Sequence, residues 1–299
     1  MKKFHKYLDE EYKELYSHHD KTKGFYAELD ERYWDTDIVV ITAHGTEEYI
    51  IGDNGSAGGK NLIRIDDCSR LKHSFIFAFS CSTGSLGQQI CEQHKAISYI
   101  GFNDFIDLVV KTNGNRYEKE LAMILKEIYN ESLKASFTGF INKNYNVNEF
   151  KKLISKKLLE SHAAVLAMDP DQIATKFCIS KKVTNNSLFI STLQMDLLST
   201  IHKVRERIVV HGEPEFIPWL FITETHSDIL KLIEKVKEAN FIDGYNEYYK
   251  YFMLAYLYRL IDLNELSEKS FQQAKALNPN YMPLRYLEKF TGELESEVS

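Results

Sequence analysis

Three short apolar runs, separated by longer segments of helical period, constrain the fold of this 299-residue chain more than any other feature. They are Asp37–Ala43, Phe75–Phe79 and Ala96–Ile100, and β-branched or aromatic residues dominate each of them. Strands that are buried on both faces have this pattern, and helical segments between such strands place them side by side in a parallel sheet. The chain is therefore expected to be an α/β protein whose parallel sheet carries helices on both faces.

Weaker patterns surround these strands. Residues 1–35 have the spacing of an amphipathic helix, and residues 48–51 and 62–65 flank a Gly-rich loop in the manner of a hairpin. Residues 214–223 are apolar, but Pro214 and Pro218 limit them to an edge strand or an irregular stretch. Further helices are predicted over residues 86–94, 115–133, 147–163 and 187–204.

The last part of the chain is helical only, from Ser227 to about Leu287, with a break at residues 278–280. Its small and aromatic residues resemble the pattern of one tetratricopeptide repeat (TPR). The matching positions are Tyr251, Leu254, Ala255, Tyr258, Ser267, Phe271, Ala274 and Pro279. A single repeat cannot bury both of its apolar faces, so it should pack on the α/β part or on a partner. The predicted organisation is a helix over 1–35, an α/β domain over 36–224 and a helical region over 225–299.

Composition limits the classes of partner and compartment. With 37 Lys and Arg against 43 Asp and Glu, the net charge of −6 gives no reason to expect direct nucleic-acid binding. The amino-terminal residues are charged and no apolar run approaches about 18 residues, so neither a signal peptide nor a membrane span is expected. The four unevenly spaced cysteines favour free thiols in a cytoplasmic protein, and three of them (Cys68, Cys91 and Cys178) are interpreted as buried structural residues.

Two chemically active residues follow neighbouring strands of the predicted sheet. His44 and Gly45 come after the first strand, and Cys81 comes directly after the second, within the small polar run Ser80–Gly84. The carboxyl ends of parallel strands open on one edge, so the imidazole and the thiol are expected to meet there. An imidazolium and the amino end of the next helix would both favour the thiolate, and a cysteine nucleophile needs no third residue.

These two motifs resemble those of the caspase-like (clan CD) cysteine peptidases, and most closely the bacterial CHAT branch. In that family one strand ends in His-Gly and the next ends in a small residue, Cys, Thr or Ser, and Gly. The similarity extends over about 37–224 and is dense over 37–107, where residues 99–107 resemble the following strand and its acidic loop. Residues 214–222, with their Pro and Trp, resemble the last strand of the family.

The resemblance implies a role for each matched residue. His44 is expected to act as general base and acid, Cys81 as the nucleophile, and the backbone amides of Gly45 and Cys81 as the oxyanion hole. Asp104 and Asp107 are the candidates for a pocket that binds a basic substrate side chain, because Phe79 stands where metacaspases carry an Asp. Only 36 residues precede the His-bearing strand, so the first strand or two of the family's sheet are missing or supplied elsewhere. No metal or cofactor is implied.

Two classes of function are compatible with these patterns. The preferred hypothesis is a cysteine endopeptidase that cleaves a protein partner and is held idle within a bacterial defence or cell-death system. Its helical tail would bind the protein substrate or a regulatory sensor protein, and the resemblance also allows a homodimer. The alternative is a catalytically silent caspase-like adaptor that uses the tail as a scaffold. A small-molecule acyltransferase with the same dyad stays open as a third reading.

Three other motifs favour ordinary structural roles. Residues 55–61 resemble a phosphate-binding P-loop, but they have one residue too few between the outer glycines and lack the Ser or Thr that would bind magnesium. Cys91 and His94 have no second pair at zinc-binding spacing. His162, His202 and His211 stand outside any motif, and the His18-His19 pair is expected to be solvated.

Overall fold

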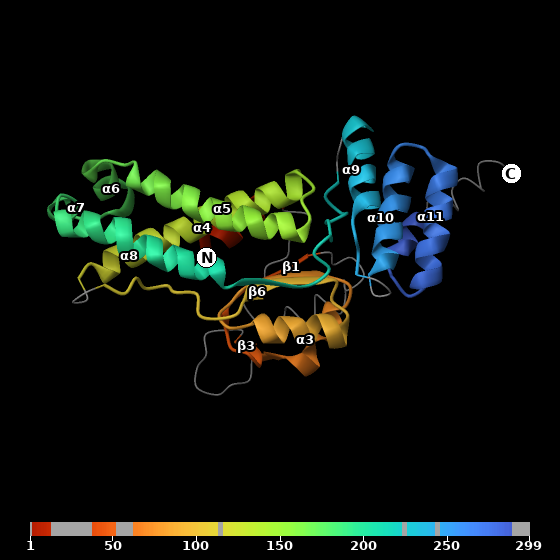
Figure 1. Ribbon diagram of the computed structural model, residues 1–299, viewed down its shortest axis with the longest axis horizontal. Coiled ribbons are helices and arrows are strands. Elements are labelled where there is room, and N and C mark those ends of the chain that lie inside the picture. Colours follow the sequence, from red (N-terminus) through yellow and green to blue (C-terminus); the bar gives the residue numbers. More distant parts are fainter. Residues whose placement is uncertain are drawn as a thin grey trace.

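A mostly parallel sheet of four strands forms the centre of the computed structural model, which describes residues 2–12, 38–51, 62–112, 116–222, 226–242 and 246–288. Its strands lie in the order β1 (Ile38–Thr42), β5 (Phe75–Phe79), β6 (Ser98–Phe102) and β7 (Ile208–Gly212) (Figure 1). The first three run parallel to one another, and β7 pairs antiparallel to β6 at one edge. The predicted α/β class and the three predicted sheet strands are therefore confirmed.

A second, antiparallel sheet branches from the end of β1. It consists of β2 (His44–Gly45), β3 (Tyr49–Ile51) and β4 (Leu62–Arg64), and a 3₁₀ helix (η1, Ile65–Leu71) leads from it to β5. This confirms the hairpin that the sequence predicts. Its Gly-rich loop, which includes the P-loop-like residues 55–61, lies outside the described residues.

Side chains of β5 alternate between two cores because successive residues of a strand point to opposite faces. Phe75 and Phe77 pack against the aromatic side chains of α4 (Glu118–Asn142) and α5 (Val147–Leu166), with the Phe75 and Phe140 ring centroids 5.3 Å apart. Ile76 and Ala78 face the opposite core, which also holds Leu86 and Ile90 of α3 (Gly84–His94). Helices thus cover both faces of the sheet, as expected (Figure 1).

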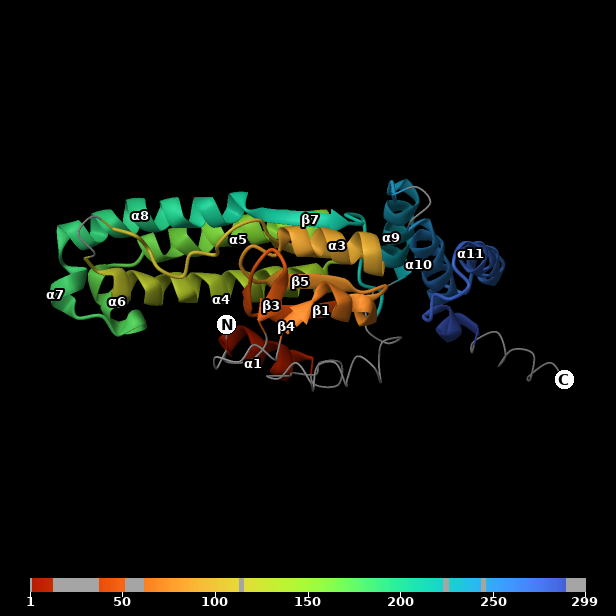
Figure 2. The same ribbon diagram turned by 90° about the horizontal axis from the view of Figure 1, so that it is seen from below.

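A long helical excursion separates β6 from β7 in the chain, although the two strands are neighbours in the sheet. It comprises α4, α5, α6 (Pro170–Phe177), α7 (Lys181–Thr184) and α8 (Ser187–Glu206). These helices extend well beyond the sheet at one end of the molecule (Figures 1 and 2). The predicted helices over 115–133, 147–163 and 187–204 correspond to α4, α5 and α8, although α4 begins at Glu118 and continues to Asn142.

The amino-terminal helix α1 (Lys2–Glu11) packs on the same body through Phe4, Tyr7 and Leu8, which are buried. The Phe4 ring lies 5.9 Å from that of Phe137 in α4. Figure 2 shows α1 beside the sheet and α4. The amphipathic helix is confirmed over these residues, and the rest of its predicted range, with His18 and His19, lies outside the described residues.

Residues 214–222 form the irregular stretch that was one of the two expected alternatives, and not the strand that the family resemblance implies. The last strand is β7, and the segment that follows it is irregular. Proline has no N–H to give to a sheet, and here the apolar residues serve a different purpose. Phe216 stacks on Phe75 with ring centroids 5.8 Å apart, while the Trp219 ring contacts Phe252 of the helical tail. The segment therefore joins the sheet core to the tail.

The tail consists of α9 (His226–Glu238), α10 (Glu247–Leu260) and α11 (Asn264–Leu277), packed beside the sheet at the end opposite the excursion (Figure 1). Tyr249 Oη donates a hydrogen bond of 2.7 Å to the Ile217 carbonyl, and Ser267 Oγ donates one of 2.9 Å to the Ala255 carbonyl between α10 and α11. The tail packs on the α/β part, as expected for a single helical repeat. None of the helices that the structure describes is both long and apolar enough to cross a membrane.

Candidate active site

His44 and Cys81 occupy equivalent places at one edge of the sheet. β1 and β5 are paired in parallel so that their last residues, Thr42 and Phe79, are partners. His44 and Cys81 each lie two residues further along the chain. The pairing thus brings both residues to the carboxyl edge of the sheet, where ligands of α/β proteins bind.

Gly45 allows the strand that carries His44 to pack closely against the turn that contains Cys81. A Cβ atom added to Gly45 would lie 2.3 Å from Ser80 Oγ, 2.5 Å from Thr83 Cγ2 and 2.6 Å from the Cys81 carbonyl oxygen. Real Cβ atoms do not approach other atoms this closely, so only glycine fits at this position. The His-Gly pair and the Ser-Cys-Ser-Thr turn are therefore in direct contact.

The turn after β5 presents Cys81 just before helix α3. Ser82 adopts a left-handed conformation (φ 53°), which is uncommon for a residue other than glycine and is found often at functional sites. Its N–H donates a hydrogen bond of 3.1 Å to the Asp104 carbonyl, and Thr83 Oγ1 donates one of 3.2 Å to the Ser80 carbonyl. Helix α3 then begins at Gly84, so the amino end of a helix dipole lies next to the thiol.

The half-exposed Cys81 thiol contacts the backbone of Ile106. The Ile106 N–H donates a hydrogen bond of 3.2 Å to Cys81 Sγ, and Sγ lies 4.0 Å from the Ile106 carbonyl oxygen. The His44 ring is exposed, and no hydrogen bond joins it to Cys81 among the described residues. Hydrogen bonds of this kind often form only when substrate is bound, so the arrangement is consistent with a resting dyad.

The two acidic residues of the loop after β6 are ion-paired by an arginine that sequence analysis did not single out. Arg207 Nη2 lies 3.1 Å from Asp104 Oδ2, and its Nη1 lies 3.1 Å from Asp107 Oδ2. Arg207 follows α8 and directly precedes β7, so only the pairing of β7 with β6 brings it to this loop. No local sequence pattern signals that contact.

The same loop exposes three apolar side chains on either side of Ile106, whose backbone contacts the thiol. Phe105, Leu108 and Val109 are 65%, 40% and 50% exposed, whereas Ile106 between them is buried. With its carboxylates held by Arg207, the loop that contacts Cys81 presents mainly apolar side chains to the surface.

Comparison with known proteins identifies no relative of this chain. No family model matches the chain, and no curated protein or solved structure is significantly similar to it. The function of the chain therefore has to be argued from its own geometry.

The other cysteines differ from Cys81 in their surroundings. Cys68 and Cys91 are buried, and burial raises the pKa of each thiol to about 12, which keeps both protonated at neutral pH. Cys178 is exposed, so its interpretation as a buried residue is wrong: it ends helix α6 in a left-handed conformation (φ 53°) at the surface. Cys91 and His94 have no third ligand, and no group of His, Cys, Asp and Glu within the described ranges is suited to a metal ion.

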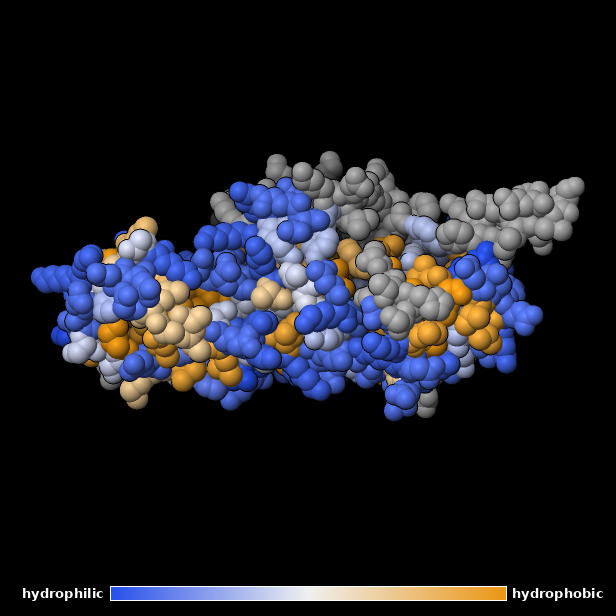
Figure 3. Space-filling view, turned by 90° about the horizontal axis from the view of Figure 1, so that it is seen from above, coloured by the Kyte–Doolittle hydropathy of each residue, from blue (hydrophilic) through white to orange (hydrophobic). Residues whose placement is uncertain are grey.

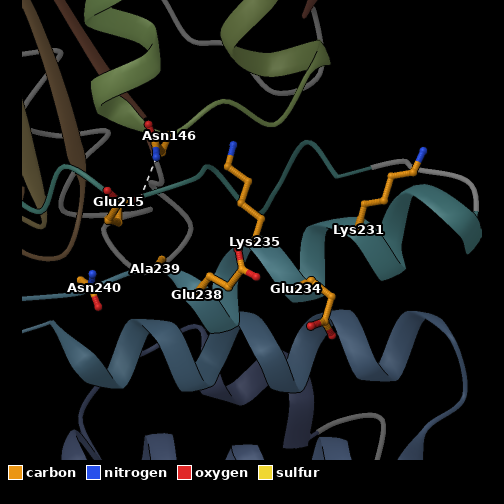
Figure 4. A pocket seen from close by; sticks show the side chains of 8 residues that line it. All are labelled: Asn146, Glu215, Lys231, Glu234, Lys235, Glu238, Ala239 and Asn240. Carbon is orange, nitrogen blue, oxygen red and sulfur yellow. Dashed lines mark hydrogen bonds between the residues drawn. The ribbon is translucent and has the colours of Figure 1, made fainter.

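A shallow polar pocket lies far from this site, between α9 and the start of α5 (Figure 4). Asn146 Nδ2 donates a hydrogen bond of 2.8 Å to Glu215 at its margin, and Lys235 forms an ion pair of 2.6 Å with Glu149. Residues next to it pack on Phe75, which begins β5, whereas Cys81 follows the end of that strand. The pocket residues are Asn146, Glu215, Lys231, Glu234, Lys235, Glu238, Ala239 and Asn240.

Proposed function

We propose that this chain is a caspase-like cysteine endopeptidase of the CHAT type, with His44 and Cys81 as its catalytic dyad and a TPR-like helical tail. One observation carries the proposal: two aligned parallel strands place His44 and Cys81 at matching positions of one sheet edge, with Gly45 seated against the Cys81 turn. Sequence motifs and sheet register agree independently on the same pair of residues.

The chemistry follows from the positions of these groups. His44 takes the proton of the Cys81 thiol, the thiolate attacks the scissile carbonyl carbon, and a C–S bond forms as the carbonyl becomes a tetrahedral oxyanion. The backbone amides of Gly45 and Cys81 would stabilise that oxyanion. His44 gives a proton to the leaving amine as the C–N bond breaks, and a thioester remains. Water activated by His44 then releases the acid product and restores the thiol.

The surroundings of Cys81 indicate which peptides would bind. Phe105, Leu108 and Val109 are exposed beside the nucleophile, whereas Asp104 and Asp107 are already paired with Arg207. A basic substrate side chain would have to compete with that guanidinium for both carboxylates. We therefore expect substrates with apolar side chains near the scissile bond to be cleaved faster than substrates with basic ones.

The helical tail is the proposed site for a regulatory or sensor protein or for the protein substrate. Its described part exposes five leucines (Leu230, Leu260, Leu263, Leu266 and Leu277), each of them at least 41% exposed. Figure 3 shows hydrophobic residues at the tail end of the molecule and again at the end of the helical excursion. Binding at the tail would control a peptidase that is idle until a trigger arrives, which suits a cytoplasmic bacterial defence or cell-death system. Because the family resemblance allows a homodimer, we also propose that two copies of the chain can associate.

Cleavage of a partner by matched variants tests the proposal. Proteins encoded beside this chain are incubated with wild type, Cys81→Ala, His44→Ala and the control variant Cys178→Ala, which alters only an exposed thiol away from the dyad. Wild type and Cys178→Ala are expected to cleave a partner, and the two dyad variants to lose at least about a hundredfold in rate. Equal cleavage by all four variants would refute the assignment.

The silent adaptor remains a second candidate because one observation favours it. In the structure the Cys81 thiol is hydrogen-bonded to Ile106, and not to His44. An adaptor needs no coupling between the two residues, so His44→Ala should leave the alkylation rate of Cys81 unchanged. The peptidase assignment predicts instead that the substitution slows alkylation at neutral pH once the trigger is supplied.

A further inference from the structure

Hydrogen bonds of backbone groups join the loop after β6 to the turn that contains Cys81. Ile106 N–H donates to Cys81 Sγ at 3.2 Å, while Ser82 N–H donates to the Asp104 carbonyl at 3.1 Å. Two contacts thus join consecutive parts of the loop to consecutive residues of the turn. The place of the Ile106 amide relative to the thiol depends on how residues 104–107 are held.

Arg207 is the side chain that holds these residues. Its Nη1 donates hydrogen bonds to the Phe105 carbonyl at 2.6 Å and to Asp107 Oδ2 at 3.1 Å, and its Nη2 pairs with Asp104 Oδ2 at 3.1 Å. Its own carbonyl accepts a hydrogen bond of 2.9 Å from Asn103 N–H. A guanidinium is planar and offers several donors in a fixed geometry, so it can fix three acceptors at once.

Ile106 lies between the residues that Arg207 binds. Phe105 precedes it and Asp107 follows it, so the guanidinium determines where the Ile106 N–H points. A hydrogen bond donated to sulfur favours the charged thiolate over the neutral thiol. We propose that Arg207 is a positioning residue for the Cys81 nucleophile, because its guanidinium holds residues 104–107 so that the Ile106 amide stabilises the thiolate. The inference rests on the proposed function only in taking Cys81 as the nucleophile.

A purely electrostatic role of Arg207 predicts different results. If only its positive charge favoured the thiolate, Arg207→Lys would keep the effect, and loss of the two negative charges in Asp104→Asn/Asp107→Asn would strengthen it. If Arg207 positions the loop, lysine cannot bridge the three acceptors, and the double variant weakens two of the three anchors. The two roles therefore predict opposite changes for the double variant.

Site-resolved alkylation separates these roles without any need for peptidase activity. Full-length protein reacts with iodoacetamide between pH 5 and pH 10, and mass spectrometry follows Cys81, with exposed Cys178 as the internal control. The midpoint of the pH profile reports thiolate stability, and the plateau at high pH reports access to the thiol. The variants are Arg207→Gln, Arg207→Lys and Asp104→Asn/Asp107→Asn. The control is Arg205→Gln, which alters a neighbouring arginine that makes none of the three contacts of Arg207.

We expect Arg207→Gln, Arg207→Lys and the double variant to raise the midpoint for Cys81 and to slow its alkylation at pH 7 by about tenfold, the effect of losing a hydrogen bond to a charged group. Arg205→Gln and every Cys178 profile should match wild type, and the buried thiols of Cys68 and Cys91 should stay unreactive, which shows that the variants are folded. An unchanged midpoint in Arg207→Gln would overturn the proposal, and so would wild-type behaviour of Arg207→Lys or faster alkylation in the double variant. Because no substrate is involved, the result is distinct from success or failure of the peptidase assignment.

Discussion

At the scale of single residues, the candidate site depends on a position without a side chain. Gly45 lies where the His-bearing strand meets the Cys81 turn, and its missing Cβ leaves the room that Ser80 Oγ and the Cys81 carbonyl occupy. Ser80 is buried, and its hydroxyl has no hydrogen-bond partner among the described residues. The two strand ends are thus packed tightly, with little space for adjustment.

Gly45→Ala is expected to force the two motifs apart. The backbone carbonyl of Cys81 cannot move aside cheaply, so the free energy of unfolding should fall by about 1–3 kcal/mol, and Cys81 alkylation should change with it. Urea denaturation of the variant measures the loss. Gly139→Ala in helix α4 is the matched control, since its Cβ would meet mainly the flexible end of Leu153 and alanine favours a helix. Equal stability of Gly45→Ala and wild type would contradict the close packing.

The residues of the site differ in how far sequence could reveal them. The positions of His44 and Cys81 were predictable because each lies two residues beyond the end of an apolar strand, and the order of parallel strands brings such ends together. Arg207 was not, since its contact with the loop depends on the antiparallel return of β7 after five helices. Asp104 and Asp107 were correctly placed in the loop, but their pairing with Arg207 has no local signal.

At the scale of secondary-structure elements, the cap of α5 links three parts of the fold. Asn146 accepts a hydrogen bond of 2.8 Å from Glu149 N–H, Glu149 accepts one of 2.8 Å from Asn146 N–H, and Lys235 of α9 pairs with the same carboxylate. Asn146 also donates to Glu215 in the segment after β7. The capping box thereby joins a helix of the excursion to the tail.

Asn146→Ala should therefore be more damaging than loss of a similar cap at the surface. We expect a decrease of about 2 kcal/mol in the free energy of unfolding, since the variant loses both the cap and the bond to Glu215. Asp169→Ala removes the equivalent, exposed capping box of α6 and should cost about 1 kcal/mol. Chemical denaturation of both variants gives the comparison, and equal losses would show that the contact with Glu215 contributes nothing.

The strands show where sequence patterns succeed and where they fail. β1 and β5 were predicted almost to the residue because their side chains are apolar along most of their length. β7 was missed, since it contains His211 and Gly212 and is only partly buried at this sheet edge. For the more apolar residues 214–222 an edge strand and an irregular stretch both stayed open, because a sequence pattern does not distinguish packing on a sheet from packing on helices.

At the scale of the whole molecule, the tail and the sheet share one core. His73, which precedes β5, packs edge-on against Tyr248 and Tyr281 of the tail, with ring centroids 5.7 Å and 5.3 Å away. Burial lowers the pKa of His73 to about 3. The imidazole between the two parts is thus neutral at physiological pH.

This contact gives stability a defined dependence on pH. The pKa of His73 is below its unfolded value of about 6.5, so between about pH 6.5 and pH 3 the unfolded chain binds a proton that the folded chain does not. Stability is therefore expected to fall as the pH decreases through that range, with further contributions from His162 and His211, whose pKa values burial also lowers. Urea unfolding at several pH values measures the slope.

In His73→Gln the free energy of unfolding should change less steeply with pH between pH 4 and pH 6. Unfolding then takes up about one proton fewer, so the slope decreases by about 1.4 kcal/mol per pH unit. His202→Gln, at an exposed position on α8, is the control and should keep the wild-type slope. The same slope in His73→Gln and wild type would show that His73 is not protected from protonation in the folded chain.

The helical excursion between β6 and β7 also determines when the candidate site can be completed during synthesis. His44, Cys81 and Ile106 leave the ribosome early, whereas Arg207 follows only after α8. Strand pairing over such a separation in sequence is slow, because a long loop must close before the contact contributes. A nascent chain therefore carries the Cys81 thiol without the Arg207 guanidinium until the whole helical excursion has been made, and Cys81 acquires its final surroundings only as the sheet closes.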